Sequence, residues 1–391
     1  MKKPTILIYI LNLSGGGAER QMINLAQSLS KHVNVILYFK NKHGKYNFNI
    51  NPEIKTIYFE HTHTINSSPF SLIKQIFHLR KTLRNEHVDI IYARLFTTFF
   101  RIFLAKKISN DSSKFVACEA SNPDLHIKQG SLKSNWFGLK KYLYKASLRS
   151  ADAVICLNNF CKNEVAQFSG QALEKIHSIP IGLDTDFIDE NINGLDAQTQ
   201  EIIKGVYNIV SIGRLHQVKD HANLIKAVNI LVNQLSITNV NVLILGEGPL
   251  YGRLHQLIID NNLEKYVHLC GFKGNPYIYL AKADFFIFTS LFEGFGNVLL
   301  EALYCKTPII TTDCQGGPQE LKQTIGDFGE IVPVNDSQKL AESILYTIKI
   351  YDQKKETINK LSILTKEIYG IDNVSRQTLE LFMKLIEDLH S

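Results

Sequence analysis

The stretch Glu293-Gly294-Phe295-Gly296-Asn297-Val298-Leu299-Leu300-Glu301 places two glutamates eight residues apart around a short glycine loop. It follows the apolar run Asp284–Ser290, typical of a buried strand, and leads into a helical pattern. A loop that opens a helix directs free N–H groups and the positive end of the helix dipole at one point, which favours a phosphate. Glu301, about one turn into the helix, can accept hydrogen bonds from both hydroxyls of a ribose, and Glu293 would face a hexose on that phosphate. The stretch therefore predicts a nucleotide-sugar site, although two glutamates on an ordinary helix more commonly form a solvated face.

Length and patterning predict two α/β domains. At 391 residues the chain is too long for one typical domain and suits two of nearly 200. Short apolar runs alternate with amphipathic segments, which indicates parallel sheets covered on both faces. We expect two doubly wound, Rossmann-like domains facing a cleft. The expected strands are Thr5–Leu11, Asn34–Phe39, Asp89–Arg94, Lys114–Glu119, Ala153–Leu157, His177–Ile181, Asn208–Ile212, Asn241–Leu245, Val267–Cys270, Phe285–Ser290, Pro308–Thr312 and Glu330–Val332.

Charge is unevenly distributed along the chain. The net charge is +6, but residues 1–190 carry 25 Lys and Arg against 15 Asp and Glu, and the remainder carries 18 against 22. A basic half joined to a mildly acidic half indicates that only one half meets an anionic surface. No apolar run is long enough to predict a membrane span, and the N-terminal apolar stretch fits a strand better than a signal peptide. The six cysteines show no C-x-x-C pattern, so we expect reduced thiols, no zinc and a cytosolic protein.

A second charged stretch, Gly213–Lys219, follows the first expected strand of the second half. Arg214 and Lys219 can clamp both phosphates of a nucleoside diphosphate, Arg in fork geometry and Lys as a point charge. Solvated loop charges are the alternative. The carboxyl end of a strand, however, is where open α/β sheets bind their ligands, and this favours the phosphate interpretation.

Together these stretches resemble glycosyltransferase family 4, whose members are retaining enzymes of the GT-B fold. Glu293 and Glu301 match its Glu-x7-Glu signature, and Gly213–Lys219 matches its Gly-Arg-Leu…Lys element. The second-half motifs follow the order of the family across Gly213–Val334. The resemblance implies an acceptor-side domain at residues 1–180, a nucleotide-sugar domain at 181–372 and a C-terminal helix at 373–391 that packs back on the first domain.

The resemblance also implies a donor site built from several loops. Gly15–Arg20 is similar to the GGAER loop of the family, and Phe272-Lys273 falls where the backbone borders the nucleobase. The implied catalytic residues are Arg214, Lys219 and Glu293. The implied donor-binding residues are Gly16, Gly17, Gly213, Arg214, Lys219, Gly246, Phe272, Lys273, Glu293, Gly294, Phe295, Gly296, Asn297, Val298 and Glu301.

Asp184-Thr185-Asp186 offers a competing interpretation, because Asp-x-Asp holds a divalent cation in the other large glycosyltransferase fold. Here it lies in Ile181–Phe187, which is similar to the hinge motif of GT-B proteins. With Arg214, Lys219 and a helix terminus supplying positive charge, we expect Asp184 and Asp186 to be structural, with neither a metal nor a separate cofactor.

The acceptor side departs from the family pattern. Many members carry a histidine after the fourth strand, whereas this chain has Cys118-Glu119-Ala120-Ser121-Asn122-Pro123. The segment resembles the Ser-Glu-Arg-Asn-x-Pro version of a subgroup acting on bacterial surface polysaccharides, with Ala120 and Ser121 in place of Arg and Asn. Glu119, Ser121 and Asn122 are the candidate acceptor-side residues, and which of them contacts the sugar stays open.

Residues 128–149 combine lysines with aromatic side chains and contain no acid. Such a segment can bind nucleic acid, but no RNA- or DNA-binding module accompanies it. An interfacial helix on the anionic inner face of a membrane fits better, and a domain-packing helix with a solvated face is the alternative. Phe70–Lys81 and Phe99–Lys107 are similar in type.

The resemblance implies a retaining, metal-independent transfer of a hexose or N-acetylhexosamine from a nucleoside-diphosphate sugar, with UDP favoured. The implied acceptor is a saccharide hydroxyl on a lipid-linked glycan in bacterial surface polysaccharide synthesis. Two alternatives stay open: a GT-B nucleotide-sugar epimerase or hydrolase, and an inactive GT-B subunit that serves as a binding partner.

Overall fold

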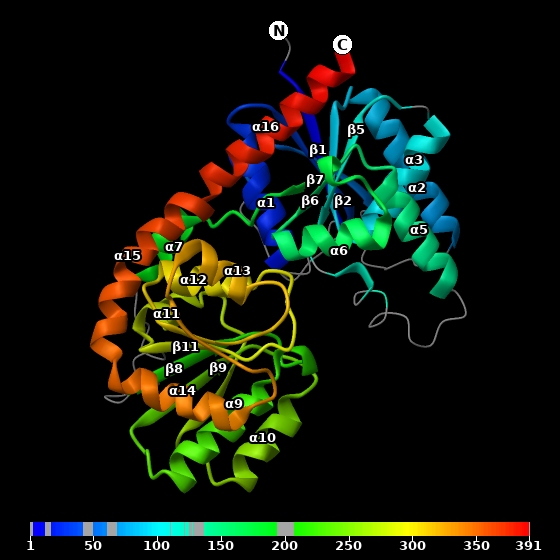
Figure 1. Ribbon diagram of the computed structural model, residues 1–391. Coiled ribbons are helices and arrows are strands. Elements are labelled where there is room, and N and C mark those ends of the chain that lie inside the picture. The colour runs from blue at the N-terminus through cyan, green and yellow to red at the C-terminus, as the bar shows by residue number, and fades with distance from the viewer. Residues whose placement is uncertain are drawn as a thin grey trace. The chain divides into compact units, whose positions relative to one another are not determined.

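The computed structural model describes residues 3–11, 17–41, 50–60, 69–109, 111–120, 122–124, 127, 137–193 and 207–390. The chain forms two compact units (Figure 1). Unit 1 comprises Met1–Gly182 and Ile371–Ser391, and unit 2 comprises Leu183–Gly370. The chain passes between the units twice. The two passages run side by side, because the Leu183 N–H donates a hydrogen bond to the Tyr369 carbonyl at 2.6 Å.

Unit 1 contains a seven-stranded parallel sheet in the order β3-β2-β1-β4-β5-β6-β7. The order reverses beside β1, the pattern of a doubly wound sheet. The central strand β1 is buried along its whole length, as expected for a strand covered on both faces. The strands are β1 (Thr5–Ile10), β2 (Asn34–Asn41), β3 (Lys55–Glu60), β4 (Ile90–Arg94), β5 (Lys114–Glu119), β6 (Ala153–Cys156) and β7 (Ile176–Ser178).

Helices cover both faces of this sheet. Leu7, Ile91 and Phe115 share one core cluster with side chains of α2, α3, α5 and α6. Successive strand residues face opposite sides, so Tyr92 points to the other face, where its ring lies 5.6 Å from that of Phe382 on α16. The helices are α1 (Gly17–Ser30), α2 (Pro69–Asn85), α3 (Phe96–Ser109), α5 (Phe137–Arg149), α6 (Asn159–Ser169) and α16 (Ile371–His390).

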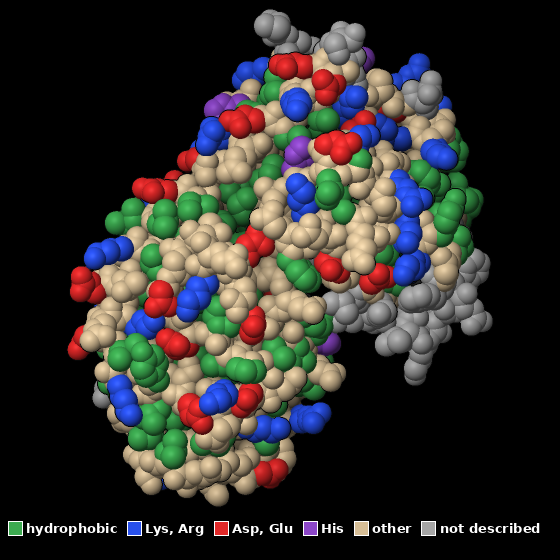
Figure 2. Space-filling view, viewed as in Figure 1, with side chains coloured by type: hydrophobic (Ala, Val, Ile, Leu, Met, Phe, Trp, Pro, Cys, Tyr) green, Lys and Arg blue, Asp and Glu red, His purple; other side chains and the backbone are tan. Residues whose placement is uncertain are grey.

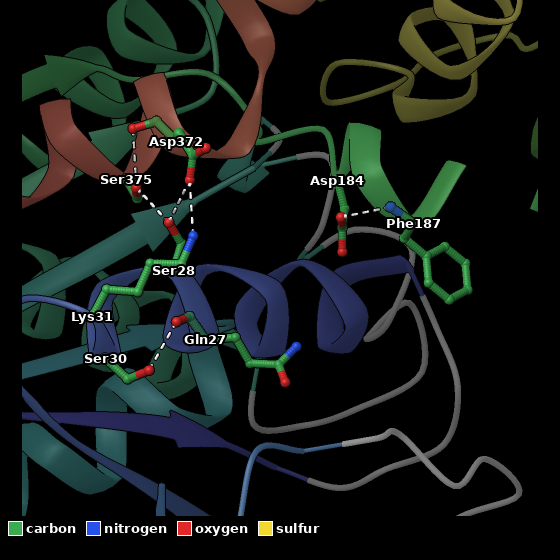
Figure 3. A network of polar contacts seen from close by, with 8 residues as sticks. All are labelled: Gln27, Ser28, Ser30, Lys31, Asp184, Phe187, Asp372 and Ser375. Atoms are coloured by element: carbon green, nitrogen blue, oxygen red, sulfur yellow. Dashed lines mark hydrogen bonds and ion pairs between the residues drawn. The ribbon is translucent and has the colours of Figure 1, made fainter. Parts of the chain in front are cut away.

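The C-terminal helix α16 is held against α1 by polar contacts (Figure 3). The hydroxyls of Ser28 and Ser375 lie 2.7 Å apart. Ser28 also donates to the Asp372 carboxylate at 3.3 Å, and Lys31 lies 3.4 Å from the same oxygen. The last 21 residues therefore belong to unit 1, although unit 2 separates them from it in the sequence.

Unit 2 contains a six-stranded parallel sheet in the order β10-β9-β8-β11-β12-β13. Ile209, Val242 and Phe285 share a core cluster with α9, α10 and α14 on one face. The other face is covered by a layer that contains α11 and α12. The strands are β8 (Tyr207–Ile212), β9 (Val240–Leu245), β10 (Val267–Gly271), β11 (Phe285–Phe288), β12 (Ile309–Thr312) and β13 (Gly329–Val332). The helices are α7 (Thr185–Ile192), α9 (His221–Asn229), α10 (Tyr251–Asp260), α11 (Tyr277–Lys282), α12 (Asn297–Tyr304), α13 (Pro318–Ile325), α14 (Ser337–Lys349) and α15 (Tyr351–Tyr369).

The predicted fold class, two doubly wound parallel sheets, is confirmed. One strand was missed: β3, Lys55-Thr-Ile-Tyr-Phe-Glu60. It lies at the edge of the sheet and is exposed or half-buried throughout, and its apolar run covers only positions 57–59 between polar residues. Within the described residues, no helix is long and apolar enough to cross a membrane. All six cysteines lie in the described part of the chain, and each is a free thiol.

Candidate functional site

The loops after the parallel strands of unit 2 meet at the carboxyl edge of its sheet. One loop follows β8 and carries Lys219; another follows β11 and carries Glu293. A backbone hydrogen bond joins them, from the Leu291 N–H to the Val218 carbonyl at 2.8 Å. Two stretches far apart in the sequence thus contribute to one site.

Glycines allow these loops to approach so closely. Gly246, after β9, has φ 146°, and a Cβ there would collide with the carbonyl oxygen of Gly213. Gly316, with φ 105°, would likewise collide with the carbonyl oxygen of Glu293. Only glycine tolerates φ values of 105° and 146° together with such close backbone contacts. Any side chain at Gly246 or Gly316 would therefore push neighbouring loops of the site apart.

Lys219 and Glu293 form an ion pair between their Nζ and Oε1 atoms. Their side chains are 23% and 18% exposed, so both are shielded yet still reach the surface. The Lys219 ammonium also lies 5.0 Å from the centre of the Phe288 ring, and the Thr289 hydroxyl donates to the Lys219 carbonyl at 2.8 Å. The predicted phosphate-binding and hexose-binding residues are therefore in direct contact.

Ser290 is a site residue that the sequence analysis missed. It is fully buried two residues after the end of β11, and its hydroxyl donates to Glu293 Oε1 at 2.9 Å. The Thr312 hydroxyl donates to the Ser290 carbonyl at 2.6 Å, which fixes the backbone at that point. A hydroxyl residue three positions before Glu293, at the end of a predicted strand, was the available signal.

Cys314 lies close to the same carboxylate but is not a nucleophile. Burial, followed by the negative charge of Glu293, raises the pKa of the Cys314 thiol to about 12. A thiol with such a pKa stays protonated at neutral pH, and only the thiolate is a nucleophile. Its role is therefore to pack beside Glu293 rather than to react.

Helix α12 begins at Asn297, as the glycine loop predicted. Gly296 precedes it with φ 83°, a left-handed conformation that suits glycine. Phe295 is buried, and its ring lies 5.7 Å from that of Tyr369. Phe295 can therefore contribute only its backbone to a ligand, whereas the first N–H groups of α12, from Asn297 and Val298, have no partner within their own helix.

Glu301 lies one turn into α12 and is half-buried. The hydroxyl of the buried Tyr277 donates to Glu301 Oε1 at 3.4 Å. The carboxylate is thus oriented by a side chain of α11, a contact the sequence did not reveal.

Arg214 and Phe272 are exposed, and Lys273 places its ammonium 5.9 Å from the centre of the Tyr279 ring. These three residues have surfaces available to a ligand.

Asp184 caps helix α7. Its carboxylate accepts a hydrogen bond from the Phe187 N–H at 3.1 Å (Figure 3). Asp186, in the first turn of the same helix, places a negative charge near the helix N-terminus, which is stabilising. Within the described residues, no group of three or more His, Cys, Asp or Glu side chains is arranged to hold a metal ion.

The acceptor-side candidates occupy different environments in unit 1. Glu119 is buried at the end of β5, where it accepts hydrogen bonds from the Tyr144 hydroxyl and, at 3.0 Å, from the Ala120 N–H. Asn122 donates to Glu164 on α6. Gly17 begins α1, whereas Gly16 and Ser121 lie outside the described residues. Glu119 is therefore available to a sugar only if Tyr144 moves, and Asn122 is the more accessible of the two.

Arg94 is a further unit 1 residue that the sequence analysis did not single out. It ends β4 and lines a small cavity together with Gln21 of α1 and Cys118 of β5. Its Nη1 donates to Gln21 Oε1 at 2.5 Å, and its buried Nε finds no acceptor among the described residues. A cation at the carboxyl end of a parallel strand is a sequence signal that could have identified it.

Comparisons with known proteins identify the family of the chain. The model of the group 1 glycosyl transferases matches residues 196–361, and that of glycosyltransferase family 4 matches residues 15–187. A protein of Campylobacter jejuni is 30% identical over 365 residues, which is 92% of this chain and 94% of that one. It is described as N-acetylgalactosamine-N,N'-diacetylbacillosaminyl-diphospho-undecaprenol 4-alpha-N-acetylgalactosaminyltransferase.

Two further similarities cover almost the whole chain. A second C. jejuni protein, a GalNAc-alpha-(1->4)-GalNAc-alpha-(1->3)-diNAcBac-PP-undecaprenol alpha-1,4-N-acetyl-D-galactosaminyltransferase, is 25% identical over 97% of this chain and 98% of its own. The solved structure of Anabaena HepE in complex with UDP-glucose has a TM-score of 0.78 at 20% identity, covering 97% of this chain and 99% of that one. The chain belongs to glycosyltransferase family 4 and has the GT-B fold.

Proposed function

We propose that this glycosyltransferase moves a hexose or N-acetylhexosamine from a UDP-sugar to a hydroxyl of a lipid-linked glycan, with retention of configuration and without a metal ion. The observation that carries the proposal is the Lys219–Glu293 pair at the carboxyl edge of the unit 2 sheet, beside the first turn of α12. A cation and free helix N–H groups suit a diphosphate, and a neighbouring carboxylate suits sugar hydroxyls.

In the proposed reaction the bond between the anomeric carbon and the diphosphate oxygen breaks, and a bond to the acceptor oxygen forms on the same face. Arg214, Lys219 and the N–H groups at the start of α12 stabilise the negative charge that develops on the departing diphosphate. The acceptor hydroxyl loses its proton to that diphosphate. Glu301 holds the ribose, and Glu293 orients the hexose.

The relatives support the choice of donor and acceptor. Both C. jejuni proteins are described as N-acetylgalactosaminyltransferases whose acceptors are linked through a diphosphate to undecaprenol. HepE was solved with UDP-glucose bound. We therefore expect a UDP-linked donor and an acceptor carried by a polyprenyl diphosphate, as in the assembly of bacterial surface glycans at the inner face of the membrane.

The test is a donor screen followed by product analysis. UDP-glucose, UDP-GlcNAc and UDP-GalNAc are incubated with the protein and a polyprenyl-diphosphate-linked saccharide, with and without EDTA. A glycan extended by one sugar, whose anomeric proton coupling in NMR matches that of the donor, supports the proposal. Free sugar formed without acceptor would indicate a hydrolase, and an altered UDP-sugar would indicate an epimerase. A protein that binds UDP but shows no turnover would be a non-catalytic subunit.

A further inference from the structure

Three neighbouring helices of unit 1, α2, α3 and α5, carry only positive charge. They pack side by side on one face of the sheet. Together they contain eleven Lys and Arg residues and no Asp or Glu, although the complete chain has 37 acidic residues. Figure 2 shows Lys and Arg side chains next to hydrophobic ones over this part of unit 1. We call the exposed side chains of these helices the basic helix surface.

Helix α2 has two apolar faces, and only one of them is used by the fold. Ile76, Leu79 and Leu83 are buried in the core. Phe70, Ile73 and Phe77 follow helical spacing on an adjoining, outward face and are 66%, 50% and 50% exposed. A helix that needed one apolar face for folding would carry polar residues on the other. The described residues of unit 1 therefore leave this outward stripe largely exposed.

Cations lie within this outward stripe. Lys74, Lys81 and Arg84 share the exposed side of α2 with the three apolar residues. The Lys74 ammonium lies 4.6 Å from the centre of the Phe70 ring, so charge and apolar surface are in contact. The neighbouring helices extend the pattern with exposed Lys107 and Ile108 on α3 and with Leu139 and Tyr142 on α5.

Among the described residues, carboxylates approach these helices at several points, including Glu60, which accepts a hydrogen bond from the Ser71 hydroxyl near the start of α2 at 3.0 Å. Asp124 pairs with Lys141 of α5 at 2.6 Å, and Glu86, just beyond α2, pairs with Lys55 at 2.6 Å. Lys141 is thus partly neutralised, and it is a poor probe of any anionic partner. Lys74, Lys81 and Lys107 take part in none of the ion pairs within the described residues.

We propose that the basic helix surface docks on an anionic lipid bilayer, with Phe70, Ile73 and Phe77 inserted at the headgroup boundary and the surrounding cations on lipid phosphates. A helix with large apolar side chains on one stripe and Lys and Arg around it is the pattern of interfacial membrane binding. A nucleic acid would contact the cations but would not bury the exposed phenylalanines, because protein–nucleic acid interfaces are polar. A second copy would bring like charges together.

The inference rests on the proposed function, because a polyprenyl-linked acceptor is itself embedded in the bilayer. It places the docking surface mainly on α2. The sequence analysis placed it on residues 128–149, of which 128–136 lie outside the described residues. Docking through α2 would keep the enzyme at the membrane surface where such acceptors reside. Exposed side chains of α5 would add further contacts to the bilayer.

Co-sedimentation of the full chain with phosphatidylcholine vesicles, with and without about one-third phosphatidylglycerol, tests the surface. Each Lys or Arg near an anionic surface contributes roughly fivefold to partitioning. Lys74→Glu/Lys81→Glu should therefore weaken binding to anionic vesicles at least twentyfold. Phe70→Ser/Phe77→Ser should weaken it at least tenfold. The matched control is Lys360→Glu/Ile363→Ser on α15 of unit 2, where Ile363 is 64% exposed, and it should bind as the wild type does.

Transfer to a short water-soluble acceptor separates this inference from the proposed function. Both α2 variants should keep that activity, which also shows that they are folded. Wild type that fails to sediment with anionic vesicles, or α2 variants that sediment like the control, would overturn the docking surface while leaving the transfer reaction standing. If Phe70→Ser/Phe77→Ser instead abolishes a dimer seen by light scattering and leaves vesicle binding intact, the stripe is a contact between copies and the membrane proposal is wrong.

Discussion

Lys219 and Glu293, which lie 74 residues apart in the sequence, form an ion pair at the carboxyl edge of the unit 2 sheet. Each is the other's counter-ion when no diphosphate is bound. A bound diphosphate brings negative charge that competes for the Lys219 ammonium, and Glu293 is then released toward the sugar. We infer that donor binding and the orientation of Glu293 are coupled through this pair.

The phosphate role of Lys219 predicts a large loss of activity in Lys219→Ala. Removing a charged hydrogen-bond partner costs about 1.5–3 kcal/mol, which is roughly tenfold to hundredfold in rate. Arg214→Ala should act in the same direction. Lys226→Ala, an exposed lysine on the adjacent helix α9, is the control and should keep full turnover. Wild-type rates in Lys219→Ala would remove this residue from the mechanism.

Substitutions of the two glutamates should have different effects on UDP affinity. Glu301→Gln should weaken the affinity for UDP, because the ribose is present with or without a sugar. Glu293→Gln should leave UDP affinity unchanged or tighten it, because the variant removes the competitor for Lys219, yet it should lower transfer. Titration calorimetry with UDP on both variants measures the difference, and equal losses of affinity would show that the assigned roles are wrong.

Ser290 should act through Glu293 rather than on the substrate. Ser290→Ala removes one buried hydrogen bond, which is worth about 1.5–3 kcal/mol when the acceptor is charged. We expect kcat to fall roughly tenfold or more, with UDP affinity intact. The neighbouring Thr289→Ser, which keeps its hydroxyl on the Lys219 carbonyl, serves as the control. A lower affinity for UDP in Ser290→Ala would instead indicate a general disruption of the loop.

The sequence predicted those parts of the fold and the site that depend on local pattern. Continuous apolar runs identified the buried strands, and parallel strands necessarily bring the loops at their carboxyl ends to one edge. Lys219 and Glu293 accordingly lie in contact, and their roles in donor binding stay predictions. The glycine loop before Asn297 likewise marked the start of α12, because the left-handed Gly296 has a clear sequence signature.

Features that depend on tertiary contacts were missed. The strand β3 has only a short apolar run, at positions 57–59, and lies exposed or half-buried at the edge of the sheet. The contact between Lys219 and Glu293, the buried hydroxyl of Ser290 and the orientation of Glu301 by Tyr277 each join different elements, and no local spacing reveals them. Burial of Glu119 beneath Tyr144 follows from the packing of α5 on β5, which a motif comparison does not include.

Asp184 should behave as a helix cap rather than a metal ligand. Removing the cap in Asp184→Ala should lower the stability of the protein by about 1 kcal/mol, whereas Asp184→Ser should restore most of it. Urea unfolding measures both variants. EDTA should leave the transfer rate of the wild type largely unchanged. If the wild type strictly required a divalent ion and Asp184→Ser lost this metal-dependent activity, Asp184 would be a metal ligand instead.

Buried His221 predicts that stability falls at mildly acidic pH. It begins α9, is almost fully buried, and its Nδ1 finds no hydrogen-bond partner among the described residues. Burial, followed by the positive charge of Lys219, lowers the pKa of His221 from 6.5 to about 4. Below pH 6.5 the imidazole of His221 becomes protonated in the unfolded chain but stays neutral in the folded chain. The folded state therefore loses stability until the pH reaches about 4.

The expected loss is about 2 kcal/mol by pH 5 and about 3 kcal/mol by pH 4, since one pKa unit corresponds to about 1.36 kcal/mol. His221→Asn should remove this part of the pH dependence, and exposed His255→Asn on α10 should retain it. The measurement is the free energy of unfolding in urea at several pH values, expressed as the difference between each variant and the wild type. This difference cancels other groups, such as Asp220, whose pKa is raised by burial and which acts in the opposite direction. Parallel pH profiles for wild type and His221→Asn would mean that the imidazole is protonated as readily in the fold as in the unfolded chain.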